Sequence, residues 1–178
     1  ICTPAQPQCL AAPHGGEPEI SDEIFENIVR YQRTLGVPAR RNLEDPLVKK
    51  GAQLFSSAGC AACHRSTFVT AQIPEEPAIS KQTIHPFTDL LLHDMGPALA
   101  DNRVDFDAAP NEWRTPALWG LGLQEAVNGH TRLLPDGRAR TITEAILWQG
   151  GEAQTSKETF RSMMQGERQS LLKFLESL

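Results

Sequence analysis

Apolar residues recur at helical spacing in several stretches of this sequence. Between residues 20 and 35 they fall on one side, with Ser21 as a good N-cap and Gly36 as a natural end. The pattern predicts a helix in this stretch. Residues 1–19 precede it, and because they are rich in Pro, Gly and Ala we expect them to form an extended arm.

Two more amphipathic helices are predicted further along the chain. Asp45 and Pro46 suit the cap and the first position of a helix that runs to about Ser57. The apolar face of this helix consists of Leu47, Val48, Gly51, Leu54 and Phe55. Residues 167–178 carry a stripe of leucines flanked by Phe174, which predicts a terminal helix.

The remaining stretches predict mostly irregular backbone. Residues 65–92 lack clear periodicity and contain three prolines, so we expect a loop with one short turn. Thr141 and Glu144 fit a capping box that opens a short helix. Gln149 then becomes a polar side chain on the apolar stripe of that helix, and a buried amide needs a partner.

These elements predict an all-α fold with long loops, in which residues 1–44 form an arm with an extra helix and residues 45–178 form a domain. The net charge is -5 and the basic residues are scattered, which argues against a nucleic-acid partner. No apolar stretch approaches the roughly 20 residues that a membrane-spanning helix needs. Since the chain opens at Ile1 rather than Met, we expect a processed product.

The chemistry of the chain centres on Cys60-Ala61-Ala62-Cys63-His64. Cys-x-x-Cys-His is the attachment signature of a c-type haem, in which both thiols form thioethers and the histidine supplies an axial nitrogen. A redox-active thiol pair and half a zinc site are the alternatives. The first is typical of a βαβ context and the second needs another Cys-x-x-Cys, and the sequence shows neither. We therefore predict one covalent haem c on Cys60 and Cys63, with His64 as proximal ligand.

Cys2 and Cys9 remain at the N-terminus and predict a small disulfide loop. Such a bond implies an oxidising compartment, and haem c attachment also takes place outside the cytoplasm. We expect a periplasmic or otherwise extracytoplasmic protein. The alternative is two free thiols in an unconstrained terminus.

Two features resemble class I cytochromes c. A Gly and a large aromatic residue precede the Cys-x-x-Cys-His segment, as in the first helix of that family, which crosses the C-terminal helix at close range. Gly96-Pro97-x-Leu99 resembles the turn whose proline carbonyl accepts a hydrogen bond from the axial histidine. The resemblance implies that Pro97 orients His64. It also places Met95 on the proximal side, which favours packing over the alternative that this methionine is the sixth iron ligand.

A more specific resemblance covers roughly residues 45–178. The segments CAACH, LLHDMGP, NGHTR, DGRAR and EAILW-x-GGEA are similar to those of di-haem oxidoreductases, a branch also called thiol oxidoreductases. This branch belongs to the superfamily of bacterial di-haem cytochrome c peroxidases and MauG-like enzymes. The resemblance implies the C-terminal haem domain of such a protein. Because this chain has a single attachment motif, we expect half of a longer protein, or a relative that lost the other half.

The same resemblance places the distal side of the haem at Gln149. That position is Met in the peroxidases, Tyr in MauG-like enzymes and usually His in this branch. Pro135 is a second departure, because a His usually precedes Asp136-Gly137. An amide oxygen is a weak ligand for haem iron, so five-coordinate iron, bound water, His130 and Met163 stay open as alternatives.

Other residues are expected to have lesser roles. Two histidines are expected to be structural: His85 and His93. Three arginines are candidates to pair with haem propionates, with solvated arginines as the alternative: Arg114, Arg138 and Arg140. Glu144 and His130 are the candidate acid–base groups if the domain is catalytic. Calcium is possible, as in some relatives, but no compact acidic loop indicates it.

We therefore predict a periplasmic c-type cytochrome domain that is the electron-transfer or peroxidase-like half of a di-haem oxidoreductase. Its partner would be an electron donor or acceptor protein, or a second haem domain. The alternatives are a stand-alone electron-transfer cytochrome and a non-catalytic haem-containing module that binds a partner. Thiol oxidation is not expected, because the haem consumes both motif cysteines.

Overall fold

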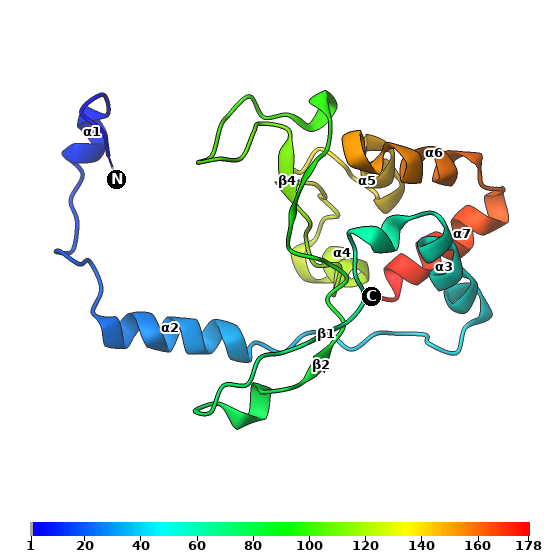
Figure 1. The fold of residues 1–178 in the computed structure, drawn as a ribbon, viewed down its shortest axis with the longest axis horizontal. Coiled ribbons are helices and arrows are strands. Elements are labelled where there is room, and N and C mark those ends of the chain that lie inside the picture. Colours follow the sequence, from blue (N-terminus) through cyan, green and yellow to red (C-terminus); the bar gives the residue numbers. More distant parts are fainter. Residues whose placement is uncertain (1) are drawn as a thin grey trace. The chain divides into compact units, whose positions relative to one another are not determined.

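The computed structural model describes residues 2–178, and the chain divides into two compact units, Ile1–Gly36 and Val37–Leu178 (Figure 1). The secondary structure is mainly helical, with short 3-10 turns and two small sheets between the helices. Within residues 2–178, no helix combines the length and the apolar character that crossing a membrane requires.

The first unit contains α1 (Pro7–Leu10) and α2 (Asp22–Thr34). The predicted start of α2 is confirmed, because the Ser21 hydroxyl accepts a hydrogen bond from the Ile24 amide at 3.4 Å. Around α1, Cys2 and Cys9 lie with their Cα atoms 5.8 Å apart, within the range that a disulfide spans.

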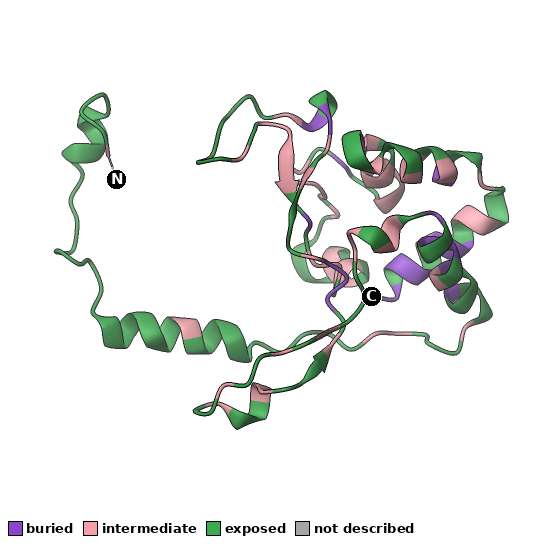
Figure 2. Cartoon of the chain, viewed as in Figure 1, coloured by how far each residue is buried: buried purple, intermediate pink, exposed green. Residues whose placement is uncertain are grey.

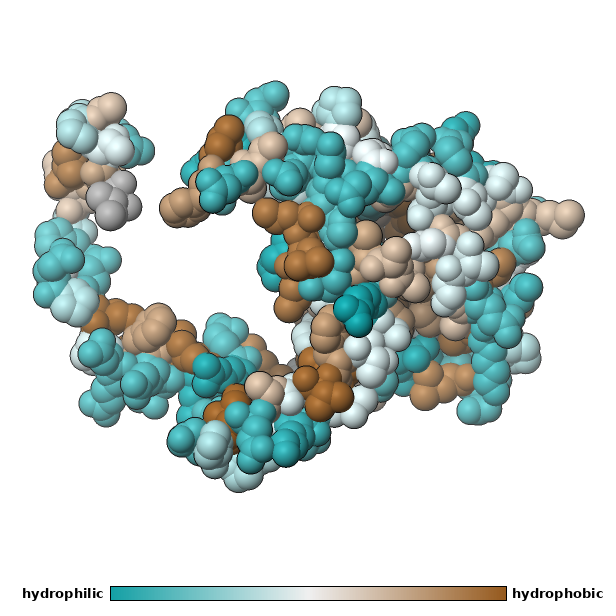
Figure 3. Space-filling view, viewed as in Figure 1, coloured by the Kyte–Doolittle hydropathy of each residue, from teal (hydrophilic) through white to brown (hydrophobic). Residues whose placement is uncertain are grey.

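The apolar stripe of α2 is exposed. Ile24, Phe25, Ile28 and Tyr31 each keep between 47% and 64% of their surface accessible, and no residue of the helix is buried. Apolar surface is accordingly visible over the α2 segment in Figure 3. The stripe predicted from the sequence is present, but the described residues of this unit do not form a core around it.

The second unit is built on α3 (Pro46–Ser57) and α7 (Gln165–Glu176). Asp45 caps α3 as predicted, since its carboxylate accepts a hydrogen bond from the Leu47 amide at 2.7 Å. The other helices are α4 (Gln124–Asn128), α5 (Ile142–Trp148) and α6 (Gln154–Ser162). Short 3-10 turns join them: η1 (Cys60–Ala62), η2 (Pro77–Ile79), η3 (Pro97–Leu99), η4 (Leu121–Leu123) and η5 (Gly151–Ala153).

The all-α prediction is wrong, because the long loops contain two small antiparallel sheets. The paired strands are β1 (Phe68–Val69) with β2 (Thr83–Ile84), and β3 (Leu92–Asp94) with β4 (Glu112–Arg114). Strands of two or three residues are too short for the alternation that identifies a strand in a sequence. They satisfy backbone groups in segments that prolines keep out of helices. Residues 65–92, expected to be a loop, contain both β1 and β2.

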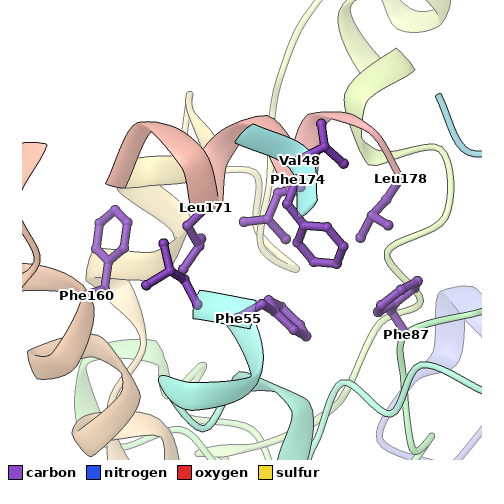
Figure 4. Packing of buried hydrophobic residues seen from close by; sticks show 9 residues of the cluster. Val48, Phe55, Phe87, Phe160, Leu171, Phe174 and Leu178 are labelled. Carbon is purple, nitrogen blue, oxygen red and sulfur yellow. The ribbon is translucent and has the colours of Figure 1, made fainter. Parts of the chain in front are cut away.

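The hydrophobic core lies where α3 and α7 cross, and the predicted close approach is confirmed. A Cβ on Gly51 would lie 2.0 Å from the Ser170 carbonyl oxygen, so only glycine permits this distance between the two helices. Figure 2 shows buried residues on both helices. The buried side chains around the crossing, drawn in Figure 4, are Val48, Leu54, Phe55, Phe87, Phe160, Leu171, Phe174, Leu175 and Leu178.

Residues 37–44, which the sequence analysis assigns to the N-terminal arm, contact the end of α7. The Arg41 amide donates to the Ser177 carbonyl at 2.8 Å. The Arg41 Nη2 donates to the carbonyls of Glu176 and Leu178 at 2.6 and 3.0 Å. This segment is therefore held against the core of the second unit.

Candidate haem site

The Cys-x-x-Cys-His segment follows directly after the core helix α3. Gly59 adopts a φ of +85°, the left-handed conformation that turns the chain from α3 into η1. The His64 amide closes this turn by donating to the Cys60 carbonyl at 3.0 Å. Cys60 and Cys63 are free cysteines and each is half-buried. Two free thiols beside an imidazole are the donor set that a c-type haem requires.

His64 is oriented by a backbone carbonyl from the loop after β2. Its Nδ1 lies 2.9 Å from the Phe87 carbonyl oxygen, so Nδ1 carries the proton and donates it. Nε2 is then left with the lone pair that iron needs. Burial lowers the pKa of His64, which favours the neutral ring. His64 is thus prepared to form one bond to iron through Nε2.

The role predicted for Pro97 is wrong, because the carbonyl on His64 belongs to Phe87. Pro97 begins η3, and the Gly96 before it packs on the turn after α5, where a Cβ on Gly96 would lie 3.0 Å from the Gly151 nitrogen. The similarity to the Gly-Pro-x-Leu turn therefore identifies a real turn, but not the one behind the histidine.

Phe87 holds a backbone conformation that is rare for a bulky residue, with a φ of +52°. The chain is fixed directly after it, since the Thr88 amide donates to the Arg65 carbonyl at 3.1 Å. The Phe87 side chain is 5% exposed, and its ring packs edge-on against those of Phe55 and Phe174. The carbonyl that the axial histidine needs is thereby anchored in the hydrophobic core.

The two thiols are electrostatically unlike those of a redox-active pair. Burial raises the pKa of Cys60 to about 11. Burial, followed by the nearby charges of Asp89 and Glu152, raises the pKa of Cys63. Redox-active Cys-x-x-Cys pairs depend instead on a lowered thiol pKa. The structure therefore disfavours that alternative.

A cluster of one histidine and two carboxylates lies beside Cys63. The His93 ring sits between Asp89, with Nε2 and Oδ2 2.8 Å apart, and Glu152, with Nδ1 and Oε2 2.9 Å apart. The His93 Nδ1 is also 3.7 Å from the Cys63 sulfur. The hydrogen bonds to Glu152 and then Asp89 raise the pKa of His93.

This arrangement also bears on the zinc alternative. Cys63, Asp89 and His93 lie close enough together to surround an ion, with ligand atoms within 4.8 Å of one another. However, both ring nitrogens of His93 already have carboxylate acceptors, and an imidazolium that donates from both nitrogens has no lone pair for a metal. The cluster therefore fits an ion-pair network better than a metal site.

Gln149, the candidate distal residue, is half-buried and follows the last residue of α5. The turn after it is pressed against β3, because a Cβ on Gly151 would lie 2.1 Å from the Asp94 carbonyl oxygen. The Glu152 carboxylate reinforces this contact, since its Oε1 accepts a hydrogen bond from the Asp94 amide at 2.9 Å. Gln149 is thus placed by a turn whose backbone is tied to β3.

Met95 belongs to the same contact. A Cβ on Gly150 would lie 2.8 Å from the Met95 carbonyl oxygen. Met95 was expected on the proximal side because Pro97 was expected there, and that reason fails once Phe87 takes the proximal role. The half-buried Met95 therefore lies beside the turn that follows Gln149.

The three candidate arginines differ in their surroundings. Arg138 forms an ion pair with Asp136, and its guanidinium lies 4.8 Å from the centroid of the Trp148 ring. Arg114 is exposed on β4, and the Arg140 side chain is 84% exposed. Arg138 already has partners, whereas the exposure of the other two fits solvated arginines.

The remaining candidates lie at exposed positions, at a helix end or against the core. His130 is exposed after the end of α4. Met163 packs against the hydrophobic core, whereas the Met164 side chain is 78% exposed. The Glu144 carboxylate accepts a hydrogen bond from the Arg140 amide at 2.8 Å, which ties it to the start of α5. These positions favour packing for Met163 and a capping role for Glu144.

Two residues near His64 were not predicted from the sequence. Phe87 contributes a backbone carbonyl, which every residue has, so no side-chain signal marks it. Arg40 lies in the part of the chain that was expected to belong to the N-terminal arm, yet its guanidinium lies over the rings of Phe87 and Phe174, 5.6 and 5.4 Å from their centroids. An arginine beside an apolar core is visible only after the chain has folded.

Comparisons with known proteins give two similarities. The family described as "Di-haem oxidoreductase, putative peroxidase" matches residues 9–178. A search of curated proteins finds no match. Among solved structures, hydrazine synthase of Kuenenia stuttgartiensis, pressurized with 20 bar xenon, is similar with a TM-score of 0.58 and 20% identity over 89% of this chain. The chain spans 56% of that protein's chain, and at this identity the likeness shows a shared fold.

Proposed function

The chain belongs to the di-haem oxidoreductase family, and we propose that it is an oxidoreductase domain carrying one covalent haem c. Cys60 and Cys63 form the thioethers, and Nε2 of His64 binds the iron. The observation that carries the proposal is the hydrogen bond from Nδ1 to the Phe87 carbonyl at 2.9 Å, which leaves Nε2 for a metal beside two free thiols. When bound, the haem supplies a one-electron Fe(III)/Fe(II) couple.

The residues around His64 support such a couple. By accepting the Nδ1 proton, the Phe87 carbonyl makes the imidazole a stronger donor at Nε2. The ring of Phe55 lies 6.2 Å from the imidazole and belongs to the buried core, so water is excluded on this side. A dry and rigid proximal side keeps the ligand in one position while the iron changes charge.

Electron transfer is the first candidate function. The family is di-haem, whereas this chain has one attachment motif, so the partner is a second haem domain or a separate electron donor or acceptor protein. A stand-alone cytochrome and a non-catalytic haem-containing module that binds a partner are the rival functions. If a second side chain bound the iron as firmly as His64, the site would suit electron transfer, because neither oxidation state would need a side chain to move.

Reduction of peroxide at this haem is the second candidate function. It is favoured by Gln149, because an amide at the distal position is a weak ligand that leaves room for another molecule at the iron. A family member with histidine or methionine there would close that position. Gln149 therefore decides between the two functions.

We place the protein outside the cytoplasm. The 5.8 Å separation of the Cys2 and Cys9 Cα atoms supports a disulfide between them. Disulfides persist in oxidising compartments such as the periplasm. Covalent haem attachment in the same compartment agrees with this location.

Production of the chain in a bacterial periplasm that attaches haem c tests the proposal. We expect one haem adduct by intact mass and a Soret band that stays with the protein in acidified acetone. The double variant Cys60→Ser/Cys63→Ser should lose the adduct. The matched control, Cys2→Ser/Cys9→Ser, should keep it. Haem that is extracted from the wild-type protein would refute covalent attachment.

Spectra of the ferric protein then separate the two functions. A low-spin spectrum that cyanide leaves unchanged supports electron transfer. A high-spin spectrum that shifts with cyanide and with peroxide supports catalysis at this haem. Gln149→His should convert the second kind of spectrum into the first, while Gln154→His, on α6, serves as the control for introducing an imidazole.

A further inference from the structure

We propose that Arg40 is a positioning residue for the proximal histidine: by packing over the Phe87 ring, it holds in place the carbonyl that accepts a hydrogen bond from His64 Nδ1. The inference rests on the proposed ligation of haem iron by His64. It gives a role to a residue that lies outside every segment of the haem motif.

The backbone conformation of Phe87 must be held by its surroundings. Its φ of +52° lies in the left-handed region, which is costly for a bulky aromatic residue. Such a conformation persists only when the surroundings impose it. If Phe87 relaxed to an ordinary φ, its carbonyl would turn, and the 2.9 Å hydrogen bond from His64 would be lost.

The Arg40 guanidinium lies over two aromatic rings. It lies 5.6 Å from the centroid of the Phe87 ring and 5.4 Å from that of Phe174. These two rings also meet each other edge to face, with centroids 5.7 Å apart. Arg40 thus lies over the contact between the loop that carries Phe87 and helix α7. A cation over the faces of two aromatic rings stabilises this contact.

Among residues 2–178, the contact with these two rings is the interaction described for the Arg40 guanidinium. Its Nε is buried and has no hydrogen-bond partner among residues 2–178. Burial also lowers the pKa of Arg40, because part of the hydration of the cation is lost. A buried donor without a partner is unfavourable, so the contact of the guanidinium with the two rings is the interaction that keeps Arg40 in place.

A purely structural role is the rival explanation, in which Arg40 only attaches residues 37–44 to the domain. Arg41 already performs that task, because its guanidinium donates to the carbonyls of Glu176 and Leu178. The two neighbouring arginines therefore separate the two roles. A change at Arg41 loosens the linker, whereas a change at Arg40 acts on Phe87.

The measurement is the solvent-exchange rate of the His64 Nδ1 proton, followed by NMR in the reduced holoprotein. Arg40→Met keeps the length of the side chain but removes the planar cation, and we expect exchange at least tenfold faster. Arg40→Lys keeps the charge without the planar face and should lie between this variant and the wild type. The reduction potential should rise in Arg40→Lys, because a less anionic imidazole stabilises Fe(III) less.

Two controls define the result. Arg65→Met removes a guanidinium that lies 5.2 Å from a single ring, that of Phe68, next to the axial histidine, and it should exchange like the wild type. Arg41→Met loosens the linker but keeps the guanidinium of Arg40, so it should accelerate exchange less than Arg40→Met does. Wild-type exchange in Arg40→Met, or equal acceleration in Arg41→Met, would overturn the inference.

The two proposals fail in different ways. If the wild-type protein binds no haem through His64, the proposed function is wrong. If haem is bound and the Arg40 variants exchange like the wild type, only the present inference is wrong. Should Arg40→Met fail to fold, Arg40→Lys keeps the charge and the aliphatic stem and carries the test alone, with wild-type exchange as the refuting result.

Discussion

The two sides of the candidate haem site are built differently. Behind His64, the support is buried, since Phe87 is 5% and Phe55 is 4% exposed and both belong to the core. The turn after Gln149 is held near the surface, where the Glu152 side chain is 55% exposed. A core support allows one arrangement of the proximal ligand, whereas a turn held at the surface can shift without unfolding the domain.

The difference has a consequence for function. The proximal side can change only with the α3–α7 core, so its geometry persists as long as the domain is folded. The turn after Gln149 can be altered by local changes, and under the proposed distal placement of Gln149 such changes would affect ligand binding at the iron. Substitutions on the two sides should therefore separate stability from ligand binding.

The largest effect is expected at the helix crossing. Gly51→Val would place its Cβ 2.0 Å from the Ser170 carbonyl oxygen, so the helices must separate, and we expect the free energy of unfolding to fall by about 3 kcal/mol or more. Denaturant unfolding of the holoprotein measures this. Gly166→Ala, on α7 with no neighbour within 4 Å, should change stability by less than about 1 kcal/mol. A stable Gly51→Val variant would mean that the helices do not cross at this residue.

The crossing was also the part of the fold that the sequence could predict. Gly51 and the leucine stripe of α7 lie in long segments with a helical period, and both ends of α3 carry local signals. The strands β1 to β4 carry no such signal, because they are two or three residues long and pair across loops. The prolines indicated where helices could not form, but they did not indicate that short strands would form there.

The candidate site also has residues that the sequence could predict and residues that it could not. Cys60, Cys63 and His64 are adjacent in sequence, so their chemistry could be predicted, and it stays a prediction until haem is measured. Phe87 was missed because hydrogen bonding by a backbone carbonyl depends on the backbone conformation and not on residue type. The pair of His93 and Glu152 was missed because 59 residues separate the partners.

The second largest effect is expected at the distal turn. Gly151→Ala would place a Cβ 2.1 Å from the Asp94 carbonyl oxygen and should push the turn off β3, changing the spin state and the cyanide affinity several-fold. Gly129→Ala is the matched control, because Gly129 has a similar positive φ of +70° but nothing within 4 Å. Both variants should lose about 1–2 kcal/mol through backbone strain, and Gly151→Ala should lose more because its Cβ also clashes with β3. Only Gly151→Ala should alter the haem spectrum.

A smaller effect is expected when the ion pair on this turn is removed. Glu152→Gln weakens the acceptor for His93 but keeps the shape of the side chain, so the turn should loosen without leaving β3. A double-mutant cycle that combines Glu152→Gln with His93→Gln should show that the two changes in cyanide affinity are not additive, since the two side chains are 2.9 Å apart. Glu158→Gln, which removes a carboxylate paired with Arg161 on α6 at 2.8 Å, should leave the haem spectrum unchanged. Additive effects in the cycle would show that Glu152 does not act through His93.

The smallest effect is expected with pH, and its sign follows from the charges around His93. The carboxylates of Glu152 and Asp89 raise the pKa of His93 above its ordinary value of about 6.5. The stability that protonated His93 contributes is therefore fully present below that ordinary value and is lost as pH rises through the raised pKa. Cys63 also faces this ring, but as a thioether it does not titrate in the holoprotein.

Unfolding of the holoprotein as a function of pH measures this contribution. The stability difference between the wild type and His93→Gln should shrink as pH rises above about 6.5. His85→Gln, at an exposed histidine whose Nδ1 lies 3.2 Å from the Ser66 carbonyl, corrects for the loss of an imidazole elsewhere. A difference that grows with pH would mean that His93 is neutral in the folded protein. In that case the turn after Gln149 would be held by the packing of its glycines and by the hydrogen bond from the Asp94 amide to Glu152, without a contribution from a charged His93.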